Sequence, residues 1–202
     1  MEKVDLKAEY KTLYTSSAKA AAMVTVPSFQ FFMLDGAGDP NNSPRFQAAM
    51  EALFTLSYTL KFLVRKVLDI DYGVMPPEGL WWAEDMSAFI QQDKAKWLYT
   101  LMIMQPEFIT PELVEDARTQ ALAKKAQPAL AEVRFERFEE GPAAQILHVG
   151  PYSEEGPTIE TLHRFIREAG KEPVGKHHEI YLTDMRRTDP ARWKTIVRQP
   201  VQ

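Results

Sequence analysis

The stretch Ser-Phe-Gln-Phe-Phe-Met-Leu at residues 28–34, followed by Asp-Gly-Ala-Gly-Asp-Pro at residues 35–40, predicts a strand and the turn that ends it. Ser43 and Pro44 then supply a capping hydroxyl and a proline suited to the first helical position. We expect the helix to run to about residue 67, because apolar residues recur on one face: Phe46, Met50, Leu53, Leu56, Leu60 and Leu63.

A similar order of elements occurs in the C-terminal part of the chain. Glu140-Gly141-Pro142 predicts a hairpin turn into a strand at residues 143–149, which Gly150 ends. Ser153 is the predicted cap of a helix that Gly170 closes, and residues 177–183 form the next predicted strand. The repeated order indicates an internal duplication of a strand–helix–strand unit.

Two more strands and a helix are predicted between these units, and the first of the strands contains Trp81 and Trp82. The segment from Trp97 to Met104 is almost continuously apolar, so we expect a strand that is covered on both faces. Thr110 and Pro111 begin a helix that ends near Lys125. We therefore expect an α+β fold with a curved antiparallel sheet, helices on one face and a central ligand cleft on the other.

Composition and charge exclude several classes of function. The 202 residues carry a net charge of −4, which argues against nucleic acid as a partner. The absence of cysteine excludes disulfides, zinc–thiolate sites and thiol nucleophiles. Residues 1–14 lack the apolar h-region of a signal peptide, and no apolar run approaches the roughly 20 residues that span a bilayer. We expect a cytoplasmic protein with no membrane partner, and its oligomeric state stays open.

The strand at residues 177–183 carries the leading candidate for chemistry. Alternation along a strand places Ile180 and Leu182 on one face, which we expect to pack on helices. His177, Glu179 and Tyr181 then face the cleft. A carboxylate in mid-strand among aromatic residues is costly unless it is paired or functional. The alternative is an edge strand on which Glu179 is simply solvated.

Aromatic and methionine side chains are candidates for a ligand-binding wall. Trp81 and Trp82 are adjacent on a predicted strand, so one can lie in the core while the other stacks on a flat ligand. Glu78 is either a second site carboxylate or a turn residue after two prolines. Met102 and Met104 share one face of a strand and suit an adaptable pocket, although each is also an ordinary core residue.

His148 and Tyr152 flank the break at Gly150 and complete the candidate ligand-binding set. The Tyr152 hydroxyl either donates a hydrogen bond in the cleft or only fixes the start of the helix. We expect no metal, because the adjacent His177 and His178 diverge on a strand and spacing provides no third ligand. We expect no cofactor either, since no complete glycine-rich nucleotide motif occurs.

Several segments together resemble the GyrI-like small-molecule-binding family, from about residue 25 onward. They are residues 148–153 (HVGPYS), 162–166 (LHxFI), 177–187 (HHEIYLxDxRR), 78–82 (EGLWW) and 97–106. The last two are similar to the longer stand-alone branch of that family. The resemblance implies duplicated strand–helix–strand–strand modules around a central cleft. We expect residues 1–24 to form an N-terminal arm and residues 25–202 the domain, with halves at about 25–128 and 129–202.

The resemblance also implies a function. Relatives include effector domains of multidrug-sensing transcription regulators, in which a buried glutamate in an aromatic pocket receives cationic drugs. Glu179 lies on the matching strand. Members of the stand-alone branch are similar to hydrolases that detoxify DNA-alkylating cyclopropanoids by opening the strained cyclopropane. The ligand is then a flat, hydrophobic, aromatic small molecule.

Ring opening fits the candidate residues. Glu179 would deprotonate a water molecule, and Tyr152 would stabilise charge that develops on the carbonyl oxygen of the substrate. Trp81, Trp82 and Met102 would form the slot for the aromatic body. One alternative is a protein that sequesters or senses such compounds without turnover. The other is an inhibitor of DNA gyrase, for which a net charge of −4 is weakly acidic.

Overall fold

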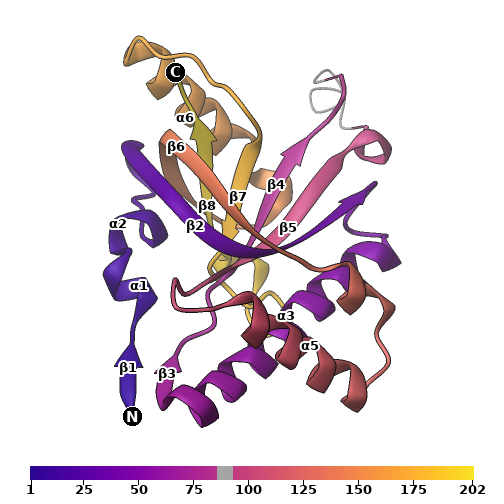
Figure 1. Cartoon of the computed structure of the whole chain (residues 1–202). Coiled ribbons are helices and arrows are strands. Elements are labelled where there is room, and N and C mark those ends of the chain that lie inside the picture. Colours follow the sequence, from indigo (N-terminus) through magenta and orange to yellow (C-terminus); the bar gives the residue numbers. More distant parts are fainter. Residues whose placement is uncertain (86–92) are drawn as a thin grey trace. The chain divides into compact units, whose positions relative to one another are not determined.

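The computed structural model describes residues 1–85 and 93–202. Figure 1 shows the chain, whose order of main elements is as follows: β1 Glu2–Val4, α1 Leu6–Glu9, α2 Lys11–Tyr14, β2 Ala22–Ala37, α3 Pro44–Leu68, β3 Ile70–Tyr72, β4 Pro77–Trp82, β5 Leu98–Gln105, α5 Pro111–Lys124, β6 Arg134–Val149, α6 Gly156–Glu168, β7 His177–Tyr181 and β8 Lys194–Pro200. Short 3-10 helices lie at Lys94–Lys96, Pro128–Glu132, Tyr152–Glu154 and Pro190–Arg192.

The fold is α+β, as predicted, and its main sheet is antiparallel. Six strands follow the hydrogen-bonding order β2-β5-β4-β7-β8-β6, which closes on itself as a barrel. The sequence predicts a curved antiparallel sheet, and its closure into a barrel is a correction to that prediction. Strands β2 and β6 are each 16 residues long, far longer than the predicted strands, and long strands can take part in more than one set of pairings.

The described chain separates into two compact units. The first contains residues 1–9, 29–77 and 82–138, and the second contains residues 10–28, 78–81 and 139–202. Both units draw on β2, β4 and β6, so their boundaries cross strands. The expected halves at residues 25–128 and 129–202, and the duplication itself, stay predictions.

In the first unit, α3 and α5 pack together beside the pair of strands β2 and β5. Both helices begin as predicted, since the Ser43 and Thr110 hydroxyls accept hydrogen bonds from the backbone N–H groups of Phe46 and Leu113. Every residue of β5 from Tyr99 to Gln105 is buried, which confirms that this strand is covered on both faces. The Gln105 amide donates to the Ser57 hydroxyl of α3, so the odd-numbered residues of β5 face that helix.

In the second unit, residues 78–81 of β4 pair with β7, β7 pairs with β8, and β8 pairs with β6. Helix α6 packs on this ladder through Leu162 and Ile166. Its partners are Ala144 and Ile146 of β6 and Val197 of β8, which form one apolar cluster with it. Because Val197 lies directly opposite Glu179 in the register, α6 covers the same face of the ladder that carries Glu179.

Three local predictions are wrong. Ile180 was expected to face the helices, but the register places Glu179 on the α6 face and Ile180 on the other. No hairpin forms at residues 140–142, because Gly141 takes a φ of 75° and strand β6 continues through it. Ser153 does not cap α6, which begins three residues later behind a 3-10 turn.

The N-terminal arm forms β1, α1 and α2, and β1 pairs in parallel with β3. Leu13 and Tyr14 of α2 are buried, so this end of the arm belongs to the core of the second unit. Among the described residues, no helix is both long enough and apolar enough to cross a membrane.

Candidate functional site

Strand β7 separates two clusters of polar side chains in the second unit. Alternate residues point to opposite faces of a strand, so His177, Glu179 and Tyr181 share one face and His178 lies on the other. The register places Trp81 opposite His177 and Gly79 opposite Glu179. The tryptophan and the catalytic candidates of the sequence analysis therefore meet on one face.

Glu179 lies at the centre of the first cluster. Its Oε2 atom accepts a hydrogen bond of 2.8 Å from the Tyr181 hydroxyl, and its Oε1 atom lies 3.1 Å from Nε2 of His177. The side chain is 14% exposed, so it is largely but not completely buried. Burial raises the pKa of Glu179, but the contacts with His177, Tyr181 and Glu155 outweigh burial and hold it below its usual value. Glu179 is therefore an ionised carboxylate at neutral pH.

Aromatic rings surround this carboxylate. The Trp81 indole donates to the Tyr181 hydroxyl at 2.9 Å, which continues the hydrogen-bond chain to Glu179. The Tyr152 ring lies 5.7 Å from the Tyr181 ring and 5.3 Å from the Trp193 ring, centroid to centroid. Such a group of rings around a negative charge suits a flat or cationic aromatic ligand.

Tyr152 belongs to this cluster of rings, and its predicted role as a cleft residue stays a prediction. Its hydroxyl donates to the sulfur of Met185 at 2.6 Å, and a thioether is a weak acceptor. Burial, together with the negative charges of Glu179 and Glu155, raises the pKa of Tyr152 well above its usual value. The hydroxyl therefore keeps its proton at neutral pH. It can donate a hydrogen bond to a ligand atom that is a better acceptor than the sulfur of Met185.

Glu155 is a site residue that the sequence analysis missed. It occupies the N-cap position of α6 but its side chain does not cap the helix, and it is only 5% exposed. Instead its carboxyl group hydrogen-bonds to Glu179. Burial and the charge of Glu179 raise the pKa of Glu155 to about 10. The two glutamates thus hold one proton and one negative charge between them.

Its place in the sequence explains why Glu155 was missed. The residue lies in a turn of mixed polar residues, where a glutamate normally faces water, and strand alternation does not apply to it. The start of the helix gave one weak indication that Glu155 has another role. A glutamate two residues before Pro157 is a less common N-cap than serine, threonine, aspartate or asparagine.

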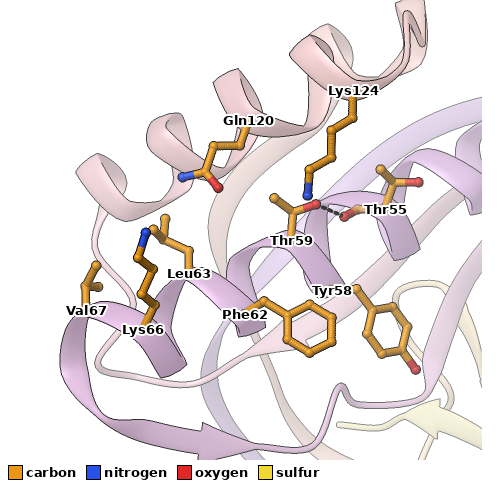
Figure 2. Close-up of a pocket in the computed structure, with 9 residues that line it drawn as sticks. All are labelled: Thr55, Tyr58, Thr59, Phe62, Leu63, Lys66, Val67, Gln120 and Lys124. Carbon is orange, nitrogen blue, oxygen red and sulfur yellow. Dashed lines mark hydrogen bonds between the residues drawn. The ribbon is translucent and has the colours of Figure 1, made fainter.

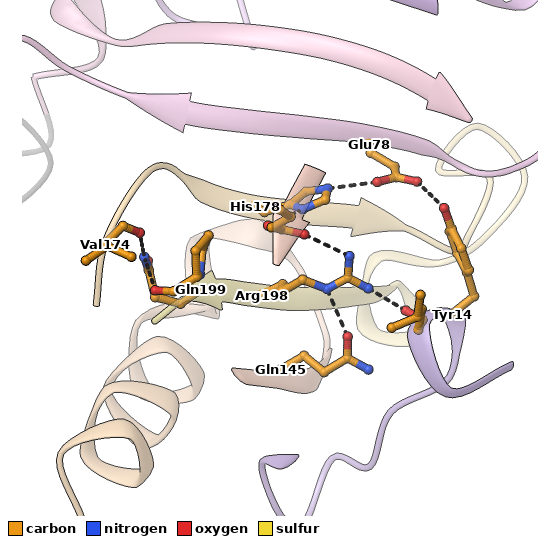
Figure 3. Close-up of polar contacts among 10 residues, drawn as sticks. Tyr14, Glu78, Gln145, Val174, His178, Arg198 and Gln199 are labelled. Atoms are coloured by element: carbon orange, nitrogen blue, oxygen red, sulfur yellow. Dashed lines mark hydrogen bonds and ion pairs between the residues drawn. The ribbon is translucent and has the colours of Figure 1, made fainter. Parts of the chain in front are cut away.

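The opposite face of β7 carries a fully buried ionic network, shown in Figure 3. His178 lies between two carboxylates, with its Nε2 atom 2.8 Å from Glu78 and its Nδ1 atom 2.8 Å from Glu140. Arg198 bonds to the second oxygen of Glu140 at 3.1 Å, and the Tyr14 hydroxyl donates to Glu78 at 2.6 Å. All four charged side chains are at most 3% exposed.

The charges in this network balance. Burial lowers the pKa of His178, but Glu140 and Glu78 outweigh burial and raise it to about 9. Burial likewise raises the pKa of Glu140, while His178 and Arg198 lower it overall. Arg198 also donates to the Gln145 side chain and to the Leu13 carbonyl, and so holds the end of the N-terminal arm. Two cations thus neutralise two anions inside the protein.

The remaining candidates have other partners than Glu179 or belong to the first unit. Glu78 belongs to the buried network on the opposite face of β7. The His148 ring bonds to the Thr158 hydroxyl and to the Pro151 carbonyl, and so holds the turn against the start of α6. Met102 and Met104 are buried on β5 in the first unit, and Trp82 is half-buried in that unit. Their predicted contact with a ligand stays a prediction.

A surface groove in the first unit is a second concave feature (Figure 2). It has a volume of about 490 Å³ and lies along α3 and α5. Its lining combines apolar and aromatic side chains with two threonines, a glutamine and two lysines, and it contains no carboxylate: Thr55, Tyr58, Thr59, Phe62, Leu63, Lys66, Val67, Gln120 and Lys124. The groove holds no arrangement of an acid, a base or a nucleophile, so it is not the candidate active site.

The Glu179 cluster offers acid–base chemistry and binding of aromatic ligands. It combines an ionised carboxylate, a protonated carboxyl group, two tyrosine hydroxyls and two tryptophan rings. Within residues 1–85 and 93–202, no group of three or more histidine, aspartate and glutamate side chains is arranged to hold a metal ion.

Comparisons with known proteins place the chain in a family. Two crystal structures of hydrolases from Listeria innocua are similar to it over the whole length. The one encoded by lin2189 is 37% identical, with 100% of both chains covered and a TM-score of 0.89, and the other is 36% identical, with 98% of this chain and 100% of that chain covered and a TM-score of 0.86. An uncharacterized conserved protein from Listeria innocua is 38% identical, with 98% and 100% covered and a TM-score of 0.91.

The C-terminal domain of EcmrR shares the fold at 14% identity, with 91% of this chain and 97% of that chain covered and a TM-score of 0.55. No curated protein matches the chain significantly. The family model of the GyrI-like small molecule binding domain matches residues 21–202. The chain therefore belongs to the GyrI-like small-molecule-binding family.

Proposed function

We propose that this protein binds flat, hydrophobic aromatic molecules beside Glu179 and hydrolyses cyclopropanoid DNA-alkylating compounds by adding water to their strained ring. The observation that carries the proposal is the ionised, partly exposed carboxylate of Glu179 among the rings of Trp81, Tyr181 and Tyr152. The similarity to two proteins described as hydrolases supports the catalytic part.

The reaction needs a base and a donor. In a cyclopropane conjugated to a dienone, the oxygen of water attacks a ring carbon and the carbon–carbon bond opens. The electron pair moves to the carbonyl oxygen. Glu179 accepts the proton of the water, and the Tyr152 hydroxyl donates a hydrogen bond to the oxygen that gains charge. Aromatisation of the product drives the opening, so a carboxylate of low basicity is sufficient when it orients the water well.

An assay by mass spectrometry tests this proposal. The protein is incubated in catalytic amounts with a cyclopropanoid, and the water adduct is counted against the amount of protein. We expect many equivalents of adduct per protein, and a loss of about 10²-fold in rate for Tyr152→Phe because one donor to the developing charge is removed. Product that stops at one equivalent, or none above the uncatalysed rate, rejects catalysis.

Binding without turnover is the second candidate function. The same cluster of rings around a negative charge favours it, because cations and flat aromatic bodies bind such sites without any reaction. The protein would then sequester or sense its ligand. Saturable binding of an aromatic compound in the absence of adduct would select this function over hydrolysis.

A further inference from the structure

We propose that Glu155 is the second carboxyl group of the ligand site, and that an aromatic cation which binds beside Glu179 displaces the proton of Glu155. The protein would thus exchange a proton for the charge of its ligand. The inference rests on the binding part of the proposed function and does not depend on hydrolysis.

The geometry of Glu155 is the first argument. A glutamate at a helix N-terminus normally turns outward or caps the helix, but Glu155 does neither. Its side chain is buried against Glu179, and apart from that contact its buried Oε1 atom has no hydrogen-bond partner among the described residues. A buried oxygen without a partner is costly, and functional sites are where such costs persist.

The charge balance of the site is the second argument. Two carboxyl groups in contact cannot both ionise easily, so the pair keeps one proton while the site is empty. The basic side chain that contacts this pair is His177, 3.1 Å from Glu179, whereas the network around His178 contains an arginine as well. Two ionised glutamates would carry more negative charge than His177 can balance, and a cationic ligand would bring the charge that balances the second.

The groups that could take part in the exchange are few. They are Glu179, His177 and Tyr181 on β7, Tyr152 on the preceding 3-10 helix, and His163 on α6, which interacts with His177. Tyr152 and Tyr181 keep their protons at neutral pH, since burial raises the pKa of both. Glu155 is the group whose proton is held chiefly by burial and by the charge of Glu179, and a bound cation offsets both effects.

The binding equilibrium then depends on pH. The empty site holds the proton on Glu155 up to pH values near 10, and a cation lowers the pKa of Glu155. At pH values between the pKa of Glu155 in the cation-bound site and its pKa in the empty site, the affinity for the cation rises with pH. The rise is up to about tenfold per pH unit. The affinity for a neutral molecule of the same shape should not rise with pH.

Isothermal titration calorimetry tests the exchange with N-methylacridinium as the cation and acridine as the neutral probe of matching shape. Titrations at pH 8 in two buffers of different ionisation enthalpy count the protons released. We expect close to one proton released per N-methylacridinium bound and none per acridine. In Glu155→Gln the cation should still bind, with no proton release and an affinity that is independent of pH. Glu154→Gln, at the exposed neighbouring residue, should behave like the unmodified protein.

Each other outcome overturns the inference. Cation binding without proton release would show that Glu155 does not exchange its proton. Release that persists in Glu155→Gln would assign the proton to another group, such as His177. Binding of acridine but not of N-methylacridinium would reject the proton exchange and leave the proposed binding function intact. Binding of neither probe would reject both the exchange and the proposed binding function.

Discussion

The two faces of β7 carry buried glutamates in opposite electrical situations. On the His178 face, Glu78 and Glu140 are each bonded to a cation or a hydroxyl, and the network is neutral. On the Glu179 face, two glutamates share a proton, and one of their oxygens has no partner among the described residues. The difference teaches that burial of charge alone does not mark a functional site. Under the proposed function, the balance of the charge distinguishes the structural network around His178 from the proposed ligand site around Glu179.

The same substitution on the two faces gives the largest expected contrast. Glu140→Gln removes an anion that His178 and Arg198 need, so we expect the free energy of unfolding to fall by about 3 to 5 kcal/mol. Glu155→Gln replaces a protonated carboxyl by a neutral amide, so the variant no longer has to take up a proton when it folds at pH 7. It should leave stability at pH 7 unchanged or raise it by about 1 to 3 kcal/mol.

Urea denaturation at pH 7 measures both effects. Glu139→Gln is the matched control, because Glu139 is the exposed neighbour of Glu140 on the same strand, and we expect it to change stability by less than about 0.5 kcal/mol. Equal losses for Glu140→Gln and Glu155→Gln would contradict the distinction between the two faces.

The pH dependence of stability sharpens the comparison. His178 has a pKa of about 9 when folded and an ordinary value of 6.5, so its contribution is complete below pH 6.5 and is lost as pH rises through 9. That difference corresponds to about 3 kcal/mol. The raised pKa of Glu155 also lowers stability as pH rises, so the measurement is made in Glu155→Gln.

We expect stability in that variant to decline between pH 6.5 and 9 in urea titrations, and the decline to disappear when His178→Gln is added. A decline of the same size in both proteins would mean that another group titrates there and that the imidazolium of His178 does not hold the network.

A substitution at Gly79 tests how tightly the side chains pack on the face of β7 that carries Glu179. A Cβ atom at this position would lie 2.7 Å from the Trp81 indole nitrogen and 2.8 Å from the Tyr181 hydroxyl. Gly79→Ala should therefore displace the hydrogen-bonded pair of rings and cost about 1 to 3 kcal/mol of stability. It should also weaken ligand binding, which tryptophan fluorescence can follow. Gly73→Ala is the control, because a Cβ there meets nothing within 4 Å, and a similar loss in both variants would refute this account.

Much of the fold could be predicted because its determinants are local. Ser43-Pro44 and Thr110-Pro111 fix the starts of two helices, and alternation along β7 correctly groups His177 with Glu179 and Tyr181. The face that α6 covers could not be predicted, because it depends on the register of β7 with β8. The continuation of β6 through Gly141 also escaped prediction, since a glycine with positive φ is compatible with a turn and with a bulge.

The site was predicted only in part for a similar reason. Alternation identifies Glu179, but the partners of the charges come from distant positions. Glu155 lies 24 residues before Glu179, while Tyr14 and Arg198 approach from opposite ends of the chain. A sequence pattern on one strand carries no information about which charges meet it in space.

Turnover by Glu179→Gln tests the central claim most directly. The substitution keeps the shape of the side chain and removes its charge, so the variant should fold, bind a flat aromatic compound and lose at least about 10²-fold in the rate of water addition. The measurement is the water adduct formed from a cyclopropanoid, counted by mass spectrometry beside the unmodified protein. Adduct formation at the unmodified rate would contradict the assignment of Glu179 as the base.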